Sequence, residues 1–467
     1  MLAETSRKPL KNAALQPKLK KLKEGLDKVK QVENFNFLLH LLNKCTGFPR
    51  VVHLMRTTPP ELLAPFLTDF DAYIDTCWYS MASGIEMSAT ARARVNLPAA
   101  YSGIGILHTS VVSTSAFVAA NKEAIPLIRK HLLKDDEEIK SFRNNMYPYI
   151  STLNAQMKVQ DRVPPVDFFQ KYKGRSLQKT LSAKIYEAKY DEIISNAAPL
   201  DKSIMATLSK SKASFFSAPI SSNGNRYVYN NLQLKNIFAF ILGSPVYPIS
   251  NNELVQCNTC GRQLLDPYGH HAVACSTDGE LTKTHYRVTH ILGEYAEKGG
   301  IRVSYEEKCD PNSSLIPGDA VFHNWQGGQD LVIDVTGVHK IQELPIDINS
   351  GEPKVFQHIH SREREKNTKY RQHCRDYGYE FRPFVFNTFG LFSGVAMDLI
   401  REIAMAWSTK EKLVYSHCVH RIKCHITFTV MASSATAITV RRPQECFSDD
   451  GVLQWRRKVR RSRGKRV

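Results

Sequence analysis

The chain has 467 residues, enough for about two to four domains, and its 42% hydrophobic and 23% charged residues are ordinary for a globular protein. Its 63 lysines and arginines exceed its 45 acids by 18, which favours a polyanionic partner such as nucleic acid. Residues 1–25 contain no apolar leader, and no stretch approaches about 18 uninterrupted apolar residues. A secreted or membrane-spanning protein is therefore not expected, and we predict a reducing intracellular compartment.

Both ends of the chain are basic. We interpret residues 1–32 as a basic tail with few acids, and residues 411–467 as a C-terminal segment that ends in a second basic tail. Residues 455–467 contain eight basic residues and no acid. Such segments are usually solvated and disordered. They would either contact phosphates or serve as a nuclear address, and the sequence does not separate these two roles.

Residues 33–235 are predicted to be mostly helical. Residues 34–42 have apolar side chains at helical spacing, and Thr57 and Thr58 precede two prolines and a second periodic run. A hydroxyl cap followed by proline is typical of a helix start. The polar stretch from about residue 151 to 235 contains no recognisable functional motif.

The pattern changes near Asn236, where short apolar runs begin to alternate with turn signals. The Gly327–Gly328 pair predicts a hairpin turn. The predicted strands cover residues 301–306, 319–323, 330–335 and 381–386, and a helix covers residues 361–377. We therefore predict an α+β multidomain protein: a helical N-terminal region, a small module over residues 236–280 and a mixed α/β domain over residues 281–410.

Four potential zinc ligands lie within the small module. Cys257, Cys260, His271 and Cys275 have the spacing C-x2-C-x10-H-x3-C. Two thiolates on one turn, with a histidine and a cysteine one helical turn apart, can occupy the corners of a tetrahedron around Zn²⁺. His270 is an alternative ligand that spacing does not exclude. A closed site with four protein ligands predicts a structural or nucleic-acid-binding role for the zinc.

A second group of histidines and cysteines lies near the C-terminus. Its spacing fits no zinc knuckle, and it sits among apolar residues, so ordinary packing is the prediction there. The group consists of His417, Cys418, His420, Cys424 and His425.

Two aspartates in the mixed α/β domain have the arrangement of a divalent-metal site. Asp319 opens one predicted strand, and Asp334 closes the strand that follows the Gly-Gly hairpin. A hairpin brings such positions together, and Asp334 has apolar neighbours, a setting in which a carboxylate needs a cation. Glu306, at the end of the preceding strand, is a further acid that could complete the set.

A lysine normally accompanies such acids and stabilises the charge that develops during phosphodiester hydrolysis. Thr336 occupies the position two residues after Asp334. The following helix offers Lys366 and Lys369, which are three residues apart and therefore on one helical face.

These segments together resemble a known family. The zinc spacing, then "PGDAVFHNWQGGQDLVIDVT", then "KNTKY" and "GYEFRPFVFNTFG" are similar to the C-terminal part of reverse-transcriptase polyproteins of non-LTR retrotransposons. Those proteins carry a zinc motif followed by a restriction-like endonuclease of the PD-(D/E)xK superfamily. The similarity extends over residues 30–135, which resemble the helical region after the polymerase palm, and over residues 235–410.

The resemblance implies a metal-dependent DNA endonuclease that nicks target DNA, with DNA and element RNA as partners and the nucleus as its location. It selects His271 as the zinc ligand and assigns Mg²⁺ to Asp319 and Asp334. It also places Lys366 or Lys369 in the catalytic site. The sequence departs from the family in having "PGD" rather than "PD", with Gly318 inserted. The alternative is a remnant that binds nucleic acid without catalysis.

The chain shows no palm domain, so we expect no polymerase activity and interpret it as the back half of such a polyprotein. The motif "FSDD" at residues 447–450 is taken as a coincidence, since only seventeen residues follow it.

Overall fold

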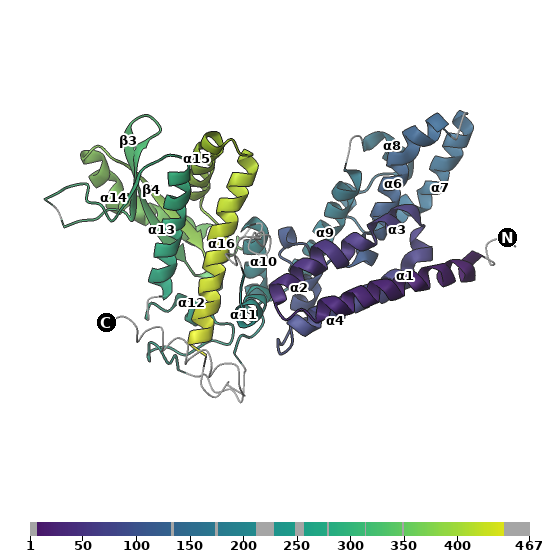
Figure 1. Ribbon diagram of the computed structural model, residues 1–467, viewed down its shortest axis with the longest axis horizontal. Helices are drawn as coiled ribbons and strands as arrows, with labels where there is room; N and C mark the ends of the chain where they lie inside the picture. Colours follow the sequence, from purple (N-terminus) through teal and green to yellow (C-terminus); the bar gives the residue numbers. More distant parts are fainter. Residues whose placement is uncertain are drawn as a thin grey trace. The chain divides into compact units, whose positions relative to one another are not determined.

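The computed structural model describes residues 7–131, 135–172, 176–211, 228–247, 256–277, 280–312, 314–347 and 350–442. The basic C-terminal tail and the "FSDD" motif lie outside the described residues. The chain divides into two compact units, each of which is described by itself (Figure 1). None of the described helices is long and apolar enough to cross a membrane.

The first unit is helical, as predicted, and it also includes the segment Ile341–Val355. Helix α11 (Asn231–Leu242) spans the boundary between the two units. The other helices are α1 (Arg7–Lys30), α2 (Phe35–Leu41), α3 (Val52–Thr57), α4 (Pro60–Met81), α5 (Ala89–Val95), α6 (Thr109–His131), α7 (Asp136–Ala155), α8 (Pro165–Lys171), α9 (Leu177–Ser195) and α10 (Pro199–Ser211).

The basic segment at the N-terminus is a helix rather than a solvated tail. Leu19, Leu26 and Val29 of α1 are buried, and α1 packs against α4. The Lys30 ammonium lies 4.1 Å from the centre of the Tyr73 ring on α4, a cation–π contact. The apolar positions share one face of the helix, and burying that face stabilises a segment that its charge alone would leave solvated.

The predicted helix start near the paired prolines is confirmed, but its cap is not a hydroxyl. Helix α4 begins at Pro60 with Pro59 as its N-cap, and no side chain accepts from its first turn. Thr58 instead ends α3. Proline is tolerated at position 60 because a backbone N–H in the first turn would have no partner within the helix.

The second unit contains a four-stranded mixed sheet, so the predicted α+β class is confirmed. Its strands lie in the order β1-β2-β3-β4; the first three are antiparallel neighbours, and β3 pairs with β4 in parallel. The predicted Gly-Gly hairpin joins β2 to β3, with both glycines at positive φ. The elements are α12 (His270–Ala274), α13 (Glu280–Lys298), β1 (Val303–Tyr305), β2 (Ala320–Trp325), β3 (Gln329–Val338), α14 (Gln357–Asp376), β4 (Glu380–Asn387), α15 (Gly394–Glu411) and α16 (Tyr415–Val440).

Helices cover both faces of this sheet. Alternate residues of β3, such as Leu331 and Ile333, pack with α13, α15 and α16, whereas Val332 faces α14 (Figure 1). The main core continues through Ile422 and Ile426 of α16, so the mixed α/β unit does not end at residue 410 as predicted. By the same alternation Asp334 shares the α14 face with Val332.

The second group of histidines and cysteines lies on α16. Cys418 and Cys424 are buried, and Cys418 belongs to the main core. The His425 ring contacts Tyr295 of α13 edge-on, with ring centres 5.9 Å apart. Cys418, Cys424 and His425 thus pack the helix onto the domain, as predicted, whereas His417 and His420 are exposed.

Candidate functional site

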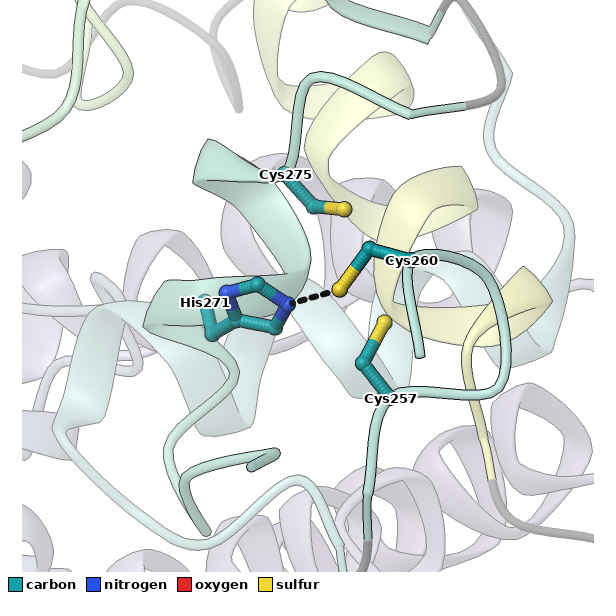
Figure 2. A group of neighbouring side chains, drawn as sticks. All are labelled: Cys257, Cys260, His271 and Cys275. Carbon is teal, nitrogen blue, oxygen red and sulfur yellow. Dashed lines mark hydrogen bonds between the residues drawn. The ribbon is translucent and has the colours of Figure 1, made fainter. Parts of the chain in front are cut away.

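The four predicted zinc ligands converge. The ligand atoms of Cys257, Cys260, His271 and Cys275 all lie within 4.8 Å of one another. Their side chains point toward a common centre (Figure 2), and Cys260 Sγ is 3.5 Å from His271 Nε2. In the part of the chain that the structure describes, this is the one group of three or more histidines, cysteines or acids arranged to hold a metal. Three sulfurs and one imidazole are a donor set that Zn²⁺ binds tetrahedrally.

Local hydrogen bonds position these ligands. The Cys257 amide donates to Gln263 O at 2.8 Å, and the amide of Gly261, at φ +61°, donates back to Cys257 O at 2.8 Å. Asp266 accepts from His270 N at 3.1 Å and from His271 N at 2.6 Å, which holds the start of α12. These hydrogen bonds are local, so the turn that carries Cys257 and Cys260 and the short helix α12 form one module without long-range strand pairing.

His271 and His270 point in different directions. His271 lies among the thiols, whereas His270 Nδ1 is 3.2 Å from His339 Nε2. His339 Nδ1 in turn lies 2.6 Å from Thr388 Oγ1, and burial lowers the pKa of His339 to about 3. The buried histidine pair is therefore neutral and belongs to the packing behind the module, which leaves His271 as the ligand.

The thiols differ in their electrostatic environment. Backbone amides of Arg262 and Gln263 donate to Cys260 and lower its pKa to about 6. Burial raises the pKa of Cys257 instead. A thiolate at Cys260 is available at neutral pH, while Cys257 needs a nearby cation to ionise, and a bound Zn²⁺ would supply that charge.

Asp334, one of the two predicted aspartates, pairs with one of the two candidate lysines. Lys366 Nζ of α14 is 2.9 Å from Asp334 Oδ1, and the Thr336 hydroxyl donates to Asp334 Oδ2 at 3.2 Å. The Asp334 side chain is only 8% exposed. Burial raises the pKa of Asp334, and the hydrogen bond from Lys366 opposes that shift. The lysine therefore reaches the acid from the next helix, from the face that α14 covers.

Backbone hydrogen bonds with β3 hold Asp319 beside Asp334. The Val335 amide donates to Asp319 Oδ2 at 2.6 Å, and the Asp319 amide donates to Ile333 O at 2.8 Å. Gly318 makes this approach possible. A Cβ at Gly318 would lie 2.4 Å from Val332 Cγ1 and 2.7 Å from Ile333 O. The inserted glycine thus lets the loop before β2 pack against β3, which places Asp319 next to Asp334.

His285 of α13 completes the arrangement, and no sequence motif pointed to it. Its Nε2 is 2.9 Å from Asp319 Oδ1, and this hydrogen bond raises the pKa of His285. Asp334 raises that pKa further, and Lys366 lowers it. The four groups therefore form one interacting set, in which the two carboxylates bond to an ammonium and to an imidazole whose pKa is raised.

The other two predicted residues lie outside this set. Lys369 is exposed and sits 4.8 Å from the centre of the Tyr370 ring. Glu306, at a positive φ of 52°, accepts a hydrogen bond from Tyr286 at 3.1 Å. Lys366 is therefore the lysine that the fold brings to the acids, and the Glu306 carboxylate bonds to Tyr286.

A cleft of about 500 Å³ opens beside the acidic pair. Lys366 and His285, each bound to one of the two aspartates, line it together with Thr336. Its floor includes the end of β3 and Phe386 of β4. A space beyond the carboxyl ends of parallel strands is a frequent ligand site in α/β sheets.

No protein-family model matches the chain, and no curated protein is similar enough to it to match. The two sites described above therefore carry the functional argument.

Proposed function

We propose that the protein is a metal-dependent DNA endonuclease derived from a retrotransposon reverse-transcriptase protein. The observation that carries the proposal is the 2.9 Å contact from Lys366 on α14 to Asp334 on β3, next to Asp319, whose carboxylate accepts from the Val335 amide of β3. Two carboxylates and a lysine from separate elements meet beside a cleft, which is the residue set that phosphodiester hydrolysis requires.

The two aspartates would hold Mg²⁺, an ion that commonly takes one or two protein carboxylates and completes its shell with water and substrate phosphate. When bound, Mg²⁺ supplies charge to the scissile phosphate and lowers the pKa of a bound water. Asp334 orients the Lys366 ammonium toward the cleft, where it would stabilise the charge on the phosphate oxygens. The hydrogen bond to Asp319 raises the pKa of His285, and a cation held by Asp319 would remove that contact and lower this pKa.

The Cys₃His cluster can hold a metal such as zinc, and its role in this proposal is structural. Four protein ligands leave no coordination position for water or substrate. The zinc would fix the knuckle against the start of α12, from which the chain leads into α13 and His285. DNA is the proposed partner, element RNA a further one, and the nucleus the proposed location.

A second candidate is a nucleic-acid-binding protein without catalysis. The observation that favours it is that each aspartate already has a basic partner, Lys366 on Asp334 and His285 on Asp319. In that case the excess of lysines and arginines binds phosphates, and no metal enters between the acids.

Nicking of supercoiled plasmid by the purified protein separates these two functions. We expect Mg²⁺-dependent nicking that falls by at least ~100-fold in Asp334→Asn, because loss of a metal-binding carboxylate removes charge stabilisation in the transition state. Asp398→Asn, an exposed acid on α15 paired with Arg401, is the matched control and should nick normally.

Equal nicking by Asp334→Asn and the unmodified protein would reject Asp334 as a metal ligand. Salt-sensitive DNA binding without nicking by any of the three proteins would favour the second candidate.

A further inference from the structure

The cleft beside the acidic pair is larger than a metal and a phosphate need. At about 500 Å³, it falls within the ~300–1,000 Å³ typical of sites that hold small organic molecules. Four helices and the sheet line it: α12, α13, α14 and α16 contribute side chains, as do the ends of β3 and β4. The remaining space therefore has room for a part of the substrate other than the scissile phosphate.

The walls combine hydroxyl groups with apolar surface. Thr284 donates its hydroxyl to Glu280 O at 2.8 Å, and Ser434 donates to Val430 O at 3.0 Å, so both oxygens keep lone pairs that can accept. Ser433 accepts from Arg287 at 3.0 Å and keeps a hydroxyl hydrogen to donate. Hydroxyls that both donate and accept, set among apolar side chains such as Phe386, suit a flat heterocycle with mixed polar edges.

The rim of the cleft provides charge and an aromatic ring. Lys366 and Arg362, both on α14, are cations suited to phosphate oxygens. Tyr286 on α13 has 45% of its surface exposed and lies edge-on to His285, with ring centres 5.6 Å apart. An exposed ring at the edge of a cleft is a stacking surface for a nucleobase.

We propose that this cleft binds one unpaired nucleotide of the DNA, with its base between α13 and α16 and its phosphate beside Lys366. The inference rests on the proposed function, since it places the scissile phosphate next to Asp319 and Asp334. A base inside the cleft must leave the stack of the duplex. This costs more free energy for a paired base than for an unpaired one. The protein therefore selects DNA with an unpaired nucleotide over fully paired DNA.

Binding without metal tests this inference independently of catalysis. Fluorescence anisotropy in EDTA would compare three labelled duplexes: one fully paired, one with a single bulged nucleotide and one with the same bulge lacking its base. We expect the bulged duplex to bind at least ~10-fold more tightly than both others, because stacking a base on protein rings contributes that much or more.

Two tryptophan substitutions on α13 locate the effect. Thr282 lines the cleft, whereas its exposed neighbour Lys283 is not among the lining residues. Thr282→Trp should reduce the preference for the bulged duplex to within about twofold by filling the cleft, while Lys283→Trp should retain it. Circular dichroism and zinc content would show that both variants fold alike.

Equal binding of the paired and bulged duplexes by the unmodified protein would overturn the inference. So would tight binding of the bulge that lacks a base, since bending rather than the base would then be recognised. A preference that survives Thr282→Trp would place the base elsewhere. If the unmodified protein does not nick DNA in Mg²⁺ but still prefers the bulged duplex, the proposed nuclease would be rejected and the assignment of the cleft would stand.

Discussion

The Cys₃His cluster and the acidic pair both gather metal-ligating side chains, but they differ in what surrounds the ligands. The cluster's four ligand atoms face one another within 4.8 Å, and no cationic side chain lies among these four. Each carboxylate of the acidic pair already has a partner, Lys366 on Asp334 and His285 on Asp319. The first arrangement would need a metal to balance its thiolates, and the second has basic side chains in that position.

The two sites should therefore differ in how far the fold depends on a metal. Without a cation, ionised thiols repel one another and protonated ones lose their ligand role, so we expect the Cys₃His module to be stable only with a metal bound. The acidic site keeps its hydrogen bonds through Lys366, His285 and the Val335 amide, and its fold does not require an ion. Removal of zinc should therefore affect folding, and removal of Mg²⁺ should affect only activity.

The largest predicted effect separates the two adjacent histidines of the module. His271→Ala should abolish stoichiometric zinc and unfold residues 256–277, because zinc contributes on the order of 10 kcal/mol to such folds. His270→Ala should keep its zinc, since His270 contacts His339 instead. Zinc content by mass spectrometry and hydrogen exchange across the module would measure both. Zinc retained in His271→Ala but lost in His270→Ala would reverse the assignment.

The next effect concerns the two lysines of α14. Lys366→Ala should lower the free energy of unfolding by about 3 kcal/mol, since it leaves the buried Asp334 carboxylate without its cation. It should also abolish nicking. Lys369→Ala is the control: its ammonium is exposed over Tyr370, so both properties should change little. Urea unfolding and plasmid nicking provide the two readouts, and a larger loss of nicking in Lys369→Ala would contradict the structure.

A smaller effect is expected from pH through His285. The hydrogen bond to Asp319 raises the pKa of His285, so its contribution to stability is complete below the ordinary imidazole pKa and is lost as pH rises through the raised value. Metal affinity has the opposite dependence, because the metal competes with this proton for Asp319. Mg²⁺-dependent nicking should therefore increase as the pH rises through the raised pKa.

A histidine on the same helix provides the control for that pH profile. His285→Asn should flatten the increase in Mg²⁺ affinity, whereas His290→Asn, which contacts Tyr305 away from the acids, should preserve it. The apparent Mg²⁺ constant measured at several pH values gives the comparison. An unchanged pH dependence in His285→Asn would show that another group holds the proton.

Much of the zinc site was predictable because its ligands lie within one short segment. The spacing defined three cysteines and two possible histidines, and the direction of His271 followed only from the fold of α12. The strands and the Gly-Gly hairpin were also predictable, since alternating apolar residues and turn glycines are local signals. The role of Gly318 was not, because a glycine that allows close packing against β3 looks the same in sequence as one in a loop.

The acidic site was predictable only in part because its residues come from separate elements. Asp319 and Asp334 could be paired through the hairpin, but both lysines of α14 satisfied helical spacing equally well. His285 precedes Asp319 by a whole strand and loop, with no spacing rule that connects them. The basic N-terminal segment was predicted from its charge as a tail, and the buried face at Leu19, Leu26 and Val29 outweighs that charge.

Asp319 and Asp334 are proposed to bind a divalent ion even though each already has a basic partner. Electron paramagnetic resonance of Mn²⁺ with the zinc-loaded protein would detect this ion. We expect one bound Mn²⁺ per chain, which is lost in the Asp319→Asn and Asp334→Asn double variant while zinc is retained. Equal Mn²⁺ binding by the double variant, or no binding by the unmodified protein, would contradict it.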